Sequence, residues 1–220
     1  MKNSVDAGGG RLENPPVSLV YWWWGCRDHI GSCARCDSGG SLQPGAVSVN
    51  VAVFDRPIPG GIEGLRATVK SMSALACIGS REEAITTLAH DLSSTRPLKT
   101  LENIFAFVTH NVHYMLDPVD VELVKSPTRT LLDRTGDCDD YSVLLAALLR
   151  ASQIPTRFVV VRTNGHDFFN HVFPEASIDD AATWIALDAT LPEPRVGKIA
   201  DGILSRTTIA FRCPGGDRNG

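Results

Sequence analysis

The feature that most constrains this chain is a strongly apolar segment that follows a single cysteine. Residues 136–140 read Gly-Asp-Cys-Asp-Asp, and the turns that follow carry Val143, Leu144, Leu145, Leu148 and Leu149. The pattern predicts a helix that begins at Cys138, with Asp137 as its N-cap, and ends before Ile154-Pro155. At the first turn of a helix, backbone N–H groups and the helix dipole favour the thiolate form of a cysteine.

Three stretches before this helix carry apolar residues at helical spacing, over residues 62–78, 80–92 and 100–112. Ser80 followed by Glu83 is typical of a capping box, so we expect the second of these helices to begin at Ser80. Ahead of all three, alternating valines between Ala46 and Phe54 predict a strand.

The part of the chain after the apolar helix has the character of strands. Residues 156–162, 171–176 and 183–190 predict three strands, the last two joined by a polar turn at Asp179-Asp180. Helices followed by antiparallel strands predict an α+β fold with a single core.

A cysteine needs a base before it can act as a nucleophile, and here the base must come from elsewhere in the fold. Asp139 and Asp140 disfavour a second negative charge beside Cys138, which makes that need greater. His171 opens one predicted strand and Asp188 lies near the end of the next, and adjacent antiparallel strands can bring such a pair into hydrogen-bonding range. The sequence therefore predicts Cys138 as nucleophile, His171 as its base and Asp188 as the group that orients the histidine.

These motifs, taken together and in this order, resemble the transglutaminase-like superfamily over residues 80–197. The resemblance rests on the 136–140 motif and its leucine-rich helix, on Ile154-Pro155-x-Arg157-x-Val159, on the His171 strand, on Asp188-Ala189-Thr190, and on Val112-His113-Tyr114 ahead of Asp117-Pro118. It implies a papain-like core, with helices packed on an antiparallel sheet and the nucleophile at a helix N-terminus. It also implies a Cys-His-Asp triad at the same three positions, in a phage or bacterial member of the superfamily.

The chain departs from the superfamily pattern close to the histidine. Members often carry Trp two residues after it, where this chain has Phe173. Pro174 then removes a backbone N–H, which predicts an edge strand or a bulge at this point. His113, Tyr114 and His166 are further polar side chains that we place near the site or, as the simpler interpretation, in packing and surface roles.

Three functions remain open. The first is a cysteine peptidase, amidase or acyltransferase that forms a thioester and passes the acyl group to water or an amine, with a protein or peptide as substrate. The second is a catalytically idle structural or assembly protein, for example of a phage particle, that reuses the fold for protein contacts. The third is a metal-binding interaction module centred on residues 26–36.

Cysteine and histidine cluster near the N-terminus, at Cys26, His29, Cys33 and Cys36. These four could hold zinc, but structural zinc sites usually have a longer loop between two ligand pairs. We expect no cofactor and favour a loop of thiols, with a local disulfide as a third interpretation. The nearby Trp22-Trp23-Trp24 run could dock on the core or bind a protein partner.

Composition and charge exclude several classes of partner. The net charge is −4 and the basic residues are scattered, so we expect neither nucleic acid nor an anionic membrane surface. The longest uncharged apolar run, residues 17–26, is too short to span a bilayer and lacks the flanks of a signal peptide. We therefore expect a cytoplasmic or virion-associated protein, and most of its six cysteines as thiols or metal ligands.

The organisation expected along the chain follows from these patterns. It comprises a flexible tail over residues 1–16, an extension with the Cys/His cluster and a strand over 17–60, the transglutaminase-like domain over 61–211 and a second tail over 212–220.

Overall fold

The computed structural model describes residues 51–53, 62–117, 123–210 and 213. The helices within them are α2 (Ile62–Gly79), α3 (Glu83–Leu92), α4 (Pro97–Asn111), α5 (Pro127–Asp133) and α6 (Cys138–Ala151). The strands are β1 (Val51–Val53), β2 (His113–Tyr114), β3 (Leu123–Lys125), β4 (Thr135–Gly136), β5 (Thr156–Thr163), β6 (His171–Ala176), β7 (Ile185–Ala186) and β8 (Ile203–Ala210). The α+β prediction is confirmed, and the central helix begins at Cys138 as predicted.

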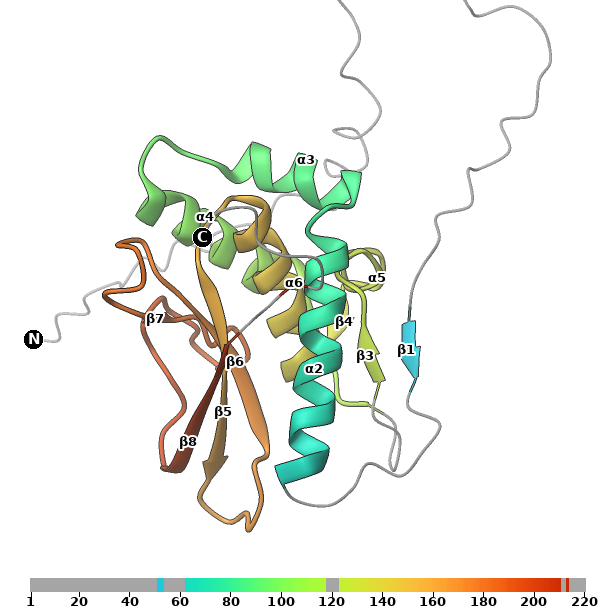
Figure 1. The fold of residues 1–220 in the computed structure, drawn as a ribbon, viewed down its shortest axis with the longest axis vertical. Coiled ribbons are helices and arrows are strands. Elements are labelled where there is room, and N and C mark those ends of the chain that lie inside the picture. The colour runs from blue at the N-terminus through green and yellow to red at the C-terminus, as the bar shows by residue number, and fades with distance from the viewer. Residues whose placement is uncertain (1–50, 54–61, 118–122, 211–212, 214–220) are drawn as a thin grey trace, which may run out of the picture. The chain divides into compact units, whose positions relative to one another are not determined.

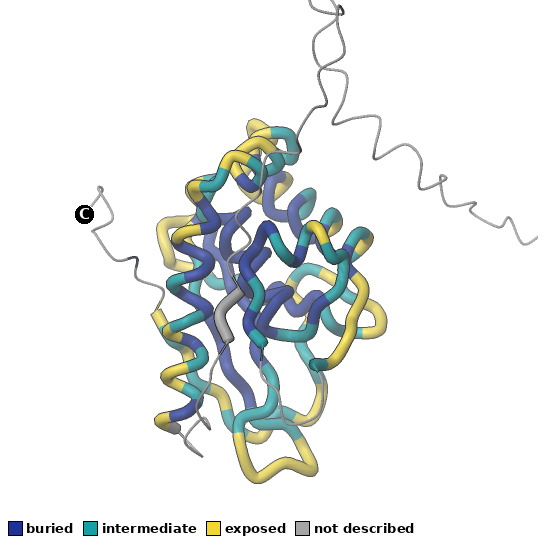
Figure 2. Tube along the Cα trace, turned by 90° about the vertical axis from the view of Figure 1, so that its right-hand side faces the viewer, coloured by how far each residue is buried: buried dark blue, intermediate teal, exposed yellow. Residues whose placement is uncertain are grey.

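Helix α6 lies in the interior of the described fold (Figures 1 and 2). Every residue from Asp139 to Leu149 is buried. The helix contacts α2, α3, α4 and α5, and it packs against β5 and β6. A helix that is apolar around most of its circumference has to be enclosed in this way. Burial of each leucine side chain stabilises the fold by about 1.5–3 kcal/mol, so the position of α6 is strongly determined.

A four-stranded sheet in the order β7-β6-β5-β8 lies against this helix, and all its pairings are antiparallel. Side chains alternate between its two faces. Phe158, Val160 and Val172 belong to the main core with α6. Val159 and Phe173 belong to a second, smaller cluster. The sheet is therefore covered on both faces here, which explains why four consecutive residues at the centre of β5, 158–161, are apolar and buried.

Strand β6 has neighbours on both sides, so the expectation of an edge strand at Pro174 is wrong. Pro174 lies opposite Phe158 of β5, and its carbonyl accepts a hydrogen bond of 2.9 Å from the Leu187 N–H on the β7 side. In an antiparallel sheet the N–H and C=O of one residue point to the same side. An N–H at position 174 would therefore point toward Leu187, one residue beyond the end of β7. Proline at this position costs the sheet only one hydrogen bond, the one to the Leu187 carbonyl.

Several element boundaries differ from the sequence prediction. Ser80 does not cap a helix N-terminus, because its hydroxyl donates to the Cys77 carbonyl at the end of α2, and α3 begins three residues later. Helix α5 and strand β8 were not predicted, and the strand expected over 183–190 contains only the two residues of β7. Helix α5 begins at a proline, and the preceding Ser126 side chain accepts a hydrogen bond from a backbone N–H of its first turn.

A disulfide joins Cys77 of α2 to Cys213, with the two Cα atoms 5.6 Å apart. The expectation of thiols or metal ligands is therefore wrong for two of the three cysteines in the described part of the chain. The pairing could not be read from the sequence, because the partners are 136 residues apart.

Some predictions fall on residues that the structure does not describe. This applies to the two predicted tails, 1–16 and 212–220, apart from Cys213. It also applies to the 17–60 extension apart from β1, and so to the Cys/His cluster at 26–36 and the Trp22-Trp24 segment. The predicted domain boundaries and the prediction of no cofactor therefore stay predictions. None of the described helices combines the length and the apolar character needed to cross a lipid bilayer.

Candidate active site

Cys138 is the first residue of α6, directly after the short strand β4 and Asp137. Asp137 occupies the predicted N-cap position in an extended conformation, but its side chain makes no capping hydrogen bond. The turn is tight at Gly136, where an added Cβ would lie 2.5 Å from the Cβ of Asp140. Glycine is therefore required here, because Asp140 packs directly against the backbone of β4.

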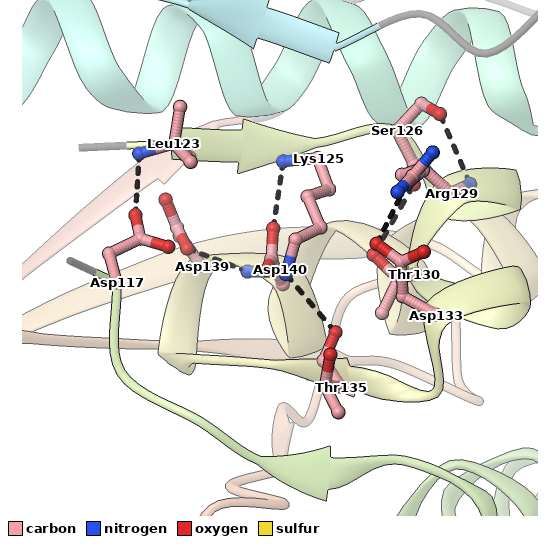
Figure 3. Close-up of polar contacts among 10 residues, drawn as sticks. All are labelled: Asp117, Leu123, Lys125, Ser126, Arg129, Thr130, Asp133, Thr135, Asp139 and Asp140. Carbon is pink, nitrogen blue, oxygen red and sulfur yellow. Dashed lines mark hydrogen bonds and ion pairs between the residues drawn. The ribbon is translucent and has the colours of Figure 1, made fainter. Parts of the chain in front are cut away.

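A buried ion pair fixes the start of α6 to β3 (Figure 3). The Asp140 side chain is fully buried and accepts hydrogen bonds from the Lys125 N–H at 2.7 Å and from Lys125 Nζ at 2.8 Å. Lys125 Nζ also donates to the carbonyl of Thr135 in β4, at 3.2 Å. Burial raises the pKa of Asp140 to about 6, although the contacts with Lys125 act in the opposite direction. Sequence reasoning treated Asp140 only as a nearby negative charge and missed Lys125.

The structure brings the predicted histidine and aspartate together. His171 is the first residue of β6, and its Nε2 lies 2.9 Å from Oδ2 of Asp188. Asp188 is fully buried, and its other oxygen accepts a 2.8 Å hydrogen bond from the hydroxyl of Thr190. Thr190 thus fixes the carboxylate that holds the imidazole. The Asp-x-Thr spacing could have indicated this role, since such local side-chain pairs are common in turns.

A contact of Ser142 places the start of α6 beside the start of β6. Ser142, one turn after Cys138, has its hydroxyl 2.6 Å from the Cys138 carbonyl and 3.2 Å from the carbonyl of Val172, which follows His171. Cys138 itself forms no disulfide. With Nε2 engaged by Asp188, Nδ1 is the imidazole nitrogen that remains to serve a thiol.

Tyr114 lies at the same end of α6. It pairs with Gly136 in the parallel β2–β4 ladder, and its ring centroid is 6.4 Å from that of Tyr141 in α6. Burial raises the pKa of Tyr114 to about 12, and the charges of Cys138 and Asp188 add to the effect. Its hydroxyl therefore keeps its proton at neutral pH and remains a hydrogen-bond donor.

The other polar or aromatic residues singled out near the histidine lie as follows. His113 is exposed in β2, and His166 is exposed in the connection between β5 and β6, where its ring contacts Phe168. Phe173 is buried with its ring centroid 5.9 Å from that of His171, so it packs beside the imidazole.

Carboxylates at the start of α6 are the groups in the described residues that could together hold a metal ion. Ligand oxygens of Asp137, Asp139 and Asp140 lie within 4.8 Å of one another. Asp140 already binds Lys125, and Asp139 accepts the N–H of Asp140 at 2.8 Å. Part of the ligand capacity of this group is therefore used within the protein.

Comparison with known proteins bears on this arrangement. Residues 86–189 match the family model of the transglutaminase-like superfamily. The core of this chain is transglutaminase-like. The resemblance inferred from the sequence is thereby confirmed, and the matched range ends one residue after Asp188.

Solved structures similar to the transglutaminase-like core are distant from it. A candidate cysteine protease from Cytophaga hutchinsonii is 22% identical, with a TM-score of 0.46, and the match covers 64% of this chain and 46% of that one. A candidate protease from Parabacteroides distasonis is 14% identical, with a TM-score of 0.45 and coverages of 67% and 36%. LapG of Legionella pneumophila is 19% identical, with a TM-score of 0.44 and coverages of 61% and 80%. The match thus spans less than half the length of the first two proteins. No curated protein sequence matches the chain.

Proposed function

We propose that this protein is a cysteine hydrolase of peptide or amide bonds, with Cys138 as nucleophile, His171 as its base and Asp188 as the group that orients the imidazole. The observation that carries the proposal is the 2.9 Å contact between His171 Nε2 and the buried carboxylate of Asp188. A carboxylate that accepts Nε2–H selects the tautomer with an unprotonated Nδ1, which is then available to the thiol.

The chemistry follows from these positions. His171 Nδ1 takes the proton of Cys138, and the thiolate attacks the carbonyl carbon of the substrate. Backbone N–H groups at the start of α6 favour the oxyanion that forms. The C–N bond breaks as His171 returns the proton to the leaving amine, which leaves an acyl thioester on Cys138. Water, activated by the same imidazole, then attacks the thioester and releases a carboxylic acid and the thiol.

The buried Asp188 stabilises the imidazolium that exists between the two proton transfers. Its second oxygen is held by Thr190, so the carboxylate cannot turn away from the ring without losing that bond. The acyl acceptor is not determined by the core, because an amine in place of water would give acyl transfer with the same residues.

The test is the reactivity of Cys138 toward iodoacetamide as a function of pH, measured by peptide mass spectrometry on the full chain. If His171 activates Cys138, alkylation proceeds at a pH well below the ordinary thiol pKa of about 8.5. His171→Ala should move the profile back toward that value, while Cys138→Ala should abolish hydrolysis and keep the fold. Identical profiles in the wild type and in folded His171→Ala would refute the activation, and would favour the idle assembly protein.

A further inference from the structure

Three consecutive large apolar side chains are exposed directly after the start of β2. Tyr114, Met115 and Leu116 have exposed fractions of 50%, 58% and 72%. The other exposed large apolar residues in the described part of the chain occur singly, as is normal for a protein surface. A run of three next to a polar site is the kind of surface that binds another molecule. We refer to residues 114–116 as the apolar rim.

The apolar rim begins beside the proposed nucleophile. Tyr114 lies opposite Gly136, which is two residues before Cys138, and the N–H of Met115 donates to the Gly136 carbonyl at 2.9 Å. The charge of Cys138 also contributes to the raised pKa of Tyr114, so the thiol and the phenol are close in space. A molecule that binds along the rim would therefore also lie close to the thiol of Cys138.

The backbone of the rim has one edge that none of the described strands pairs with. The N–H of His113 donates at 2.8 Å to the carbonyl of Arg134, the residue directly before β4, and the N–H of Met115 donates at 2.9 Å to the carbonyl of Gly136 in β4. Because alternate residues of a strand point to opposite sides, the N–H and C=O of Tyr114 point away from β4. Among the strands that the structure describes, β4 alone pairs with β2. An extended chain can add to such an edge through its main-chain groups.

The charges around the rim limit what can bind there. Asp137, Asp139 and Asp188 all act on Tyr114, and Asp117 follows Leu116 directly. These carboxylates would repel an acidic side chain brought to this surface. They would not repel a neutral or basic one.

We propose that the apolar rim is the substrate-binding surface of the hydrolase, and that its ligand is an extended, non-acidic polypeptide segment with a bulky apolar side chain within a few residues of the bond to be cleaved. This inference rests on the function proposed above. Tyr114 pairs with the main chain of the substrate, and Met115 and Leu116 contact its apolar side chain. The substrate class is then an unfolded or flexible region of a protein, because the main-chain groups of such a region are free to pair with the edge of β2.

The probe is a pool of synthetic ten-residue peptides of mixed sequence, incubated with the full chain, with the products identified by mass spectrometry. We expect cleavage sites enriched in Leu, Phe or Met near the cleaved bond and depleted in Asp and Glu. For the best peptide, the double variant Met115→Ser/Leu116→Ser should lower kcat/KM by about tenfold or more. The rate of Cys138 alkylation should not change, because neither residue takes part in the chemistry.

A matched control is Leu204→Ser, since Leu204 is an exposed residue (55%) on β8, and this variant should cleave like the wild type. An unreactive Cys138 would overturn the proposed function itself. A reactive Cys138 with no cleavage of any peptide, or an unchanged peptide preference in the double variant, would overturn only the rim as a substrate site. A dimer in sedimentation that the double variant dissociates would assign the rim to self-association instead.

Discussion

Replacement of Lys125 by methionine tests how the start of α6 is held in place. Lys125 Nζ lies 2.8 Å from Asp140 Oδ2, and their side chains are 16% and 0% exposed. Methionine retains the apolar stem but leaves a buried carboxylate without its cation. Removal of one partner of a buried ion pair typically costs about 3–5 kcal/mol. We expect a loss of unfolding free energy of this order at pH 8.

The pH dependence of that loss has a defined sign. The folded-state pKa of Asp140 is raised from 3.8 to about 6, so its proton is held more tightly in the folded than in the unfolded chain. Below about pH 6 the carboxyl is protonated in the wild type and the ion pair is absent. Without Lys125 the pKa of Asp140 rises further. The deficit of Lys125→Met should therefore be small at pH 5 and grow as the pH rises through 6.

Urea denaturation of both proteins at pH 5 and pH 8 measures this difference. Lys99→Met is the matched control, because Lys99 pairs with Glu102 on an exposed surface of α4, with exposed fractions of 46% and 44%. Such surface pairs contribute about 0–1 kcal/mol, at either pH. A loss for Lys125→Met that is equal at pH 5 and pH 8 would show that the side chain acts through packing and not through the charge of Asp140.

Further predictions concern the site and the disulfide. Asp188→Asn should lower kcat by about a hundredfold or more with little change in KM, because the charge acts on the imidazolium; a near wild-type rate would leave at most a Cys138–His171 dyad. Gly136→Ala should cost about 1–3 kcal/mol, seen by thermal melting, because the new Cβ would overlap Asp140; an unchanged melting temperature would contradict that overlap. Cys77→Ala should cost about 2–5 kcal/mol through loss of the bond to Cys213, and non-reducing peptide mapping of the wild type that finds no such bond would refute the premise.

Elements with strong periodicity were predicted well from the sequence. Helix α6 and strand β5 begin where predicted, because an apolar helix and a strand rich in β-branched residues each carry their signal within the element itself. The elements that were missed have no such signal. Strand β8 alternates intermediate and exposed residues and has few large apolar side chains. Helix α5 has only seven residues, too few for a helical period to be recognised.

The prediction of the site had the same limit. Cys138, His171 and Asp188 could be proposed because their residue types and order are informative, although their catalytic roles remain to be tested. The role of Lys125 could not be predicted, because its partner Asp140 is 15 residues away and nothing in the sequence around either residue connects them. The role of Ser142 could not be predicted either, because its contact with Val172 forms only when α6 and β6 pack together.

The contacts of three consecutive residues explain how the first turn of α6 is held. Asp140 binds Lys125 of β3, the Tyr141 hydroxyl donates to the carbonyl of Val112, and the Ser142 hydroxyl reaches the carbonyl of Val172 in β6. Successive residues of a helix are rotated by about 100°, so these contacts leave α6 in three different directions. Apolar packing alone tolerates small shifts of a helix along its axis, whereas directional hydrogen bonds do not. The leucines thus determine that α6 is buried, and the polar residues of its first turn determine where Cys138 stands relative to β6. The function proposed above requires that accuracy, because its nucleophile and its base lie on separate elements.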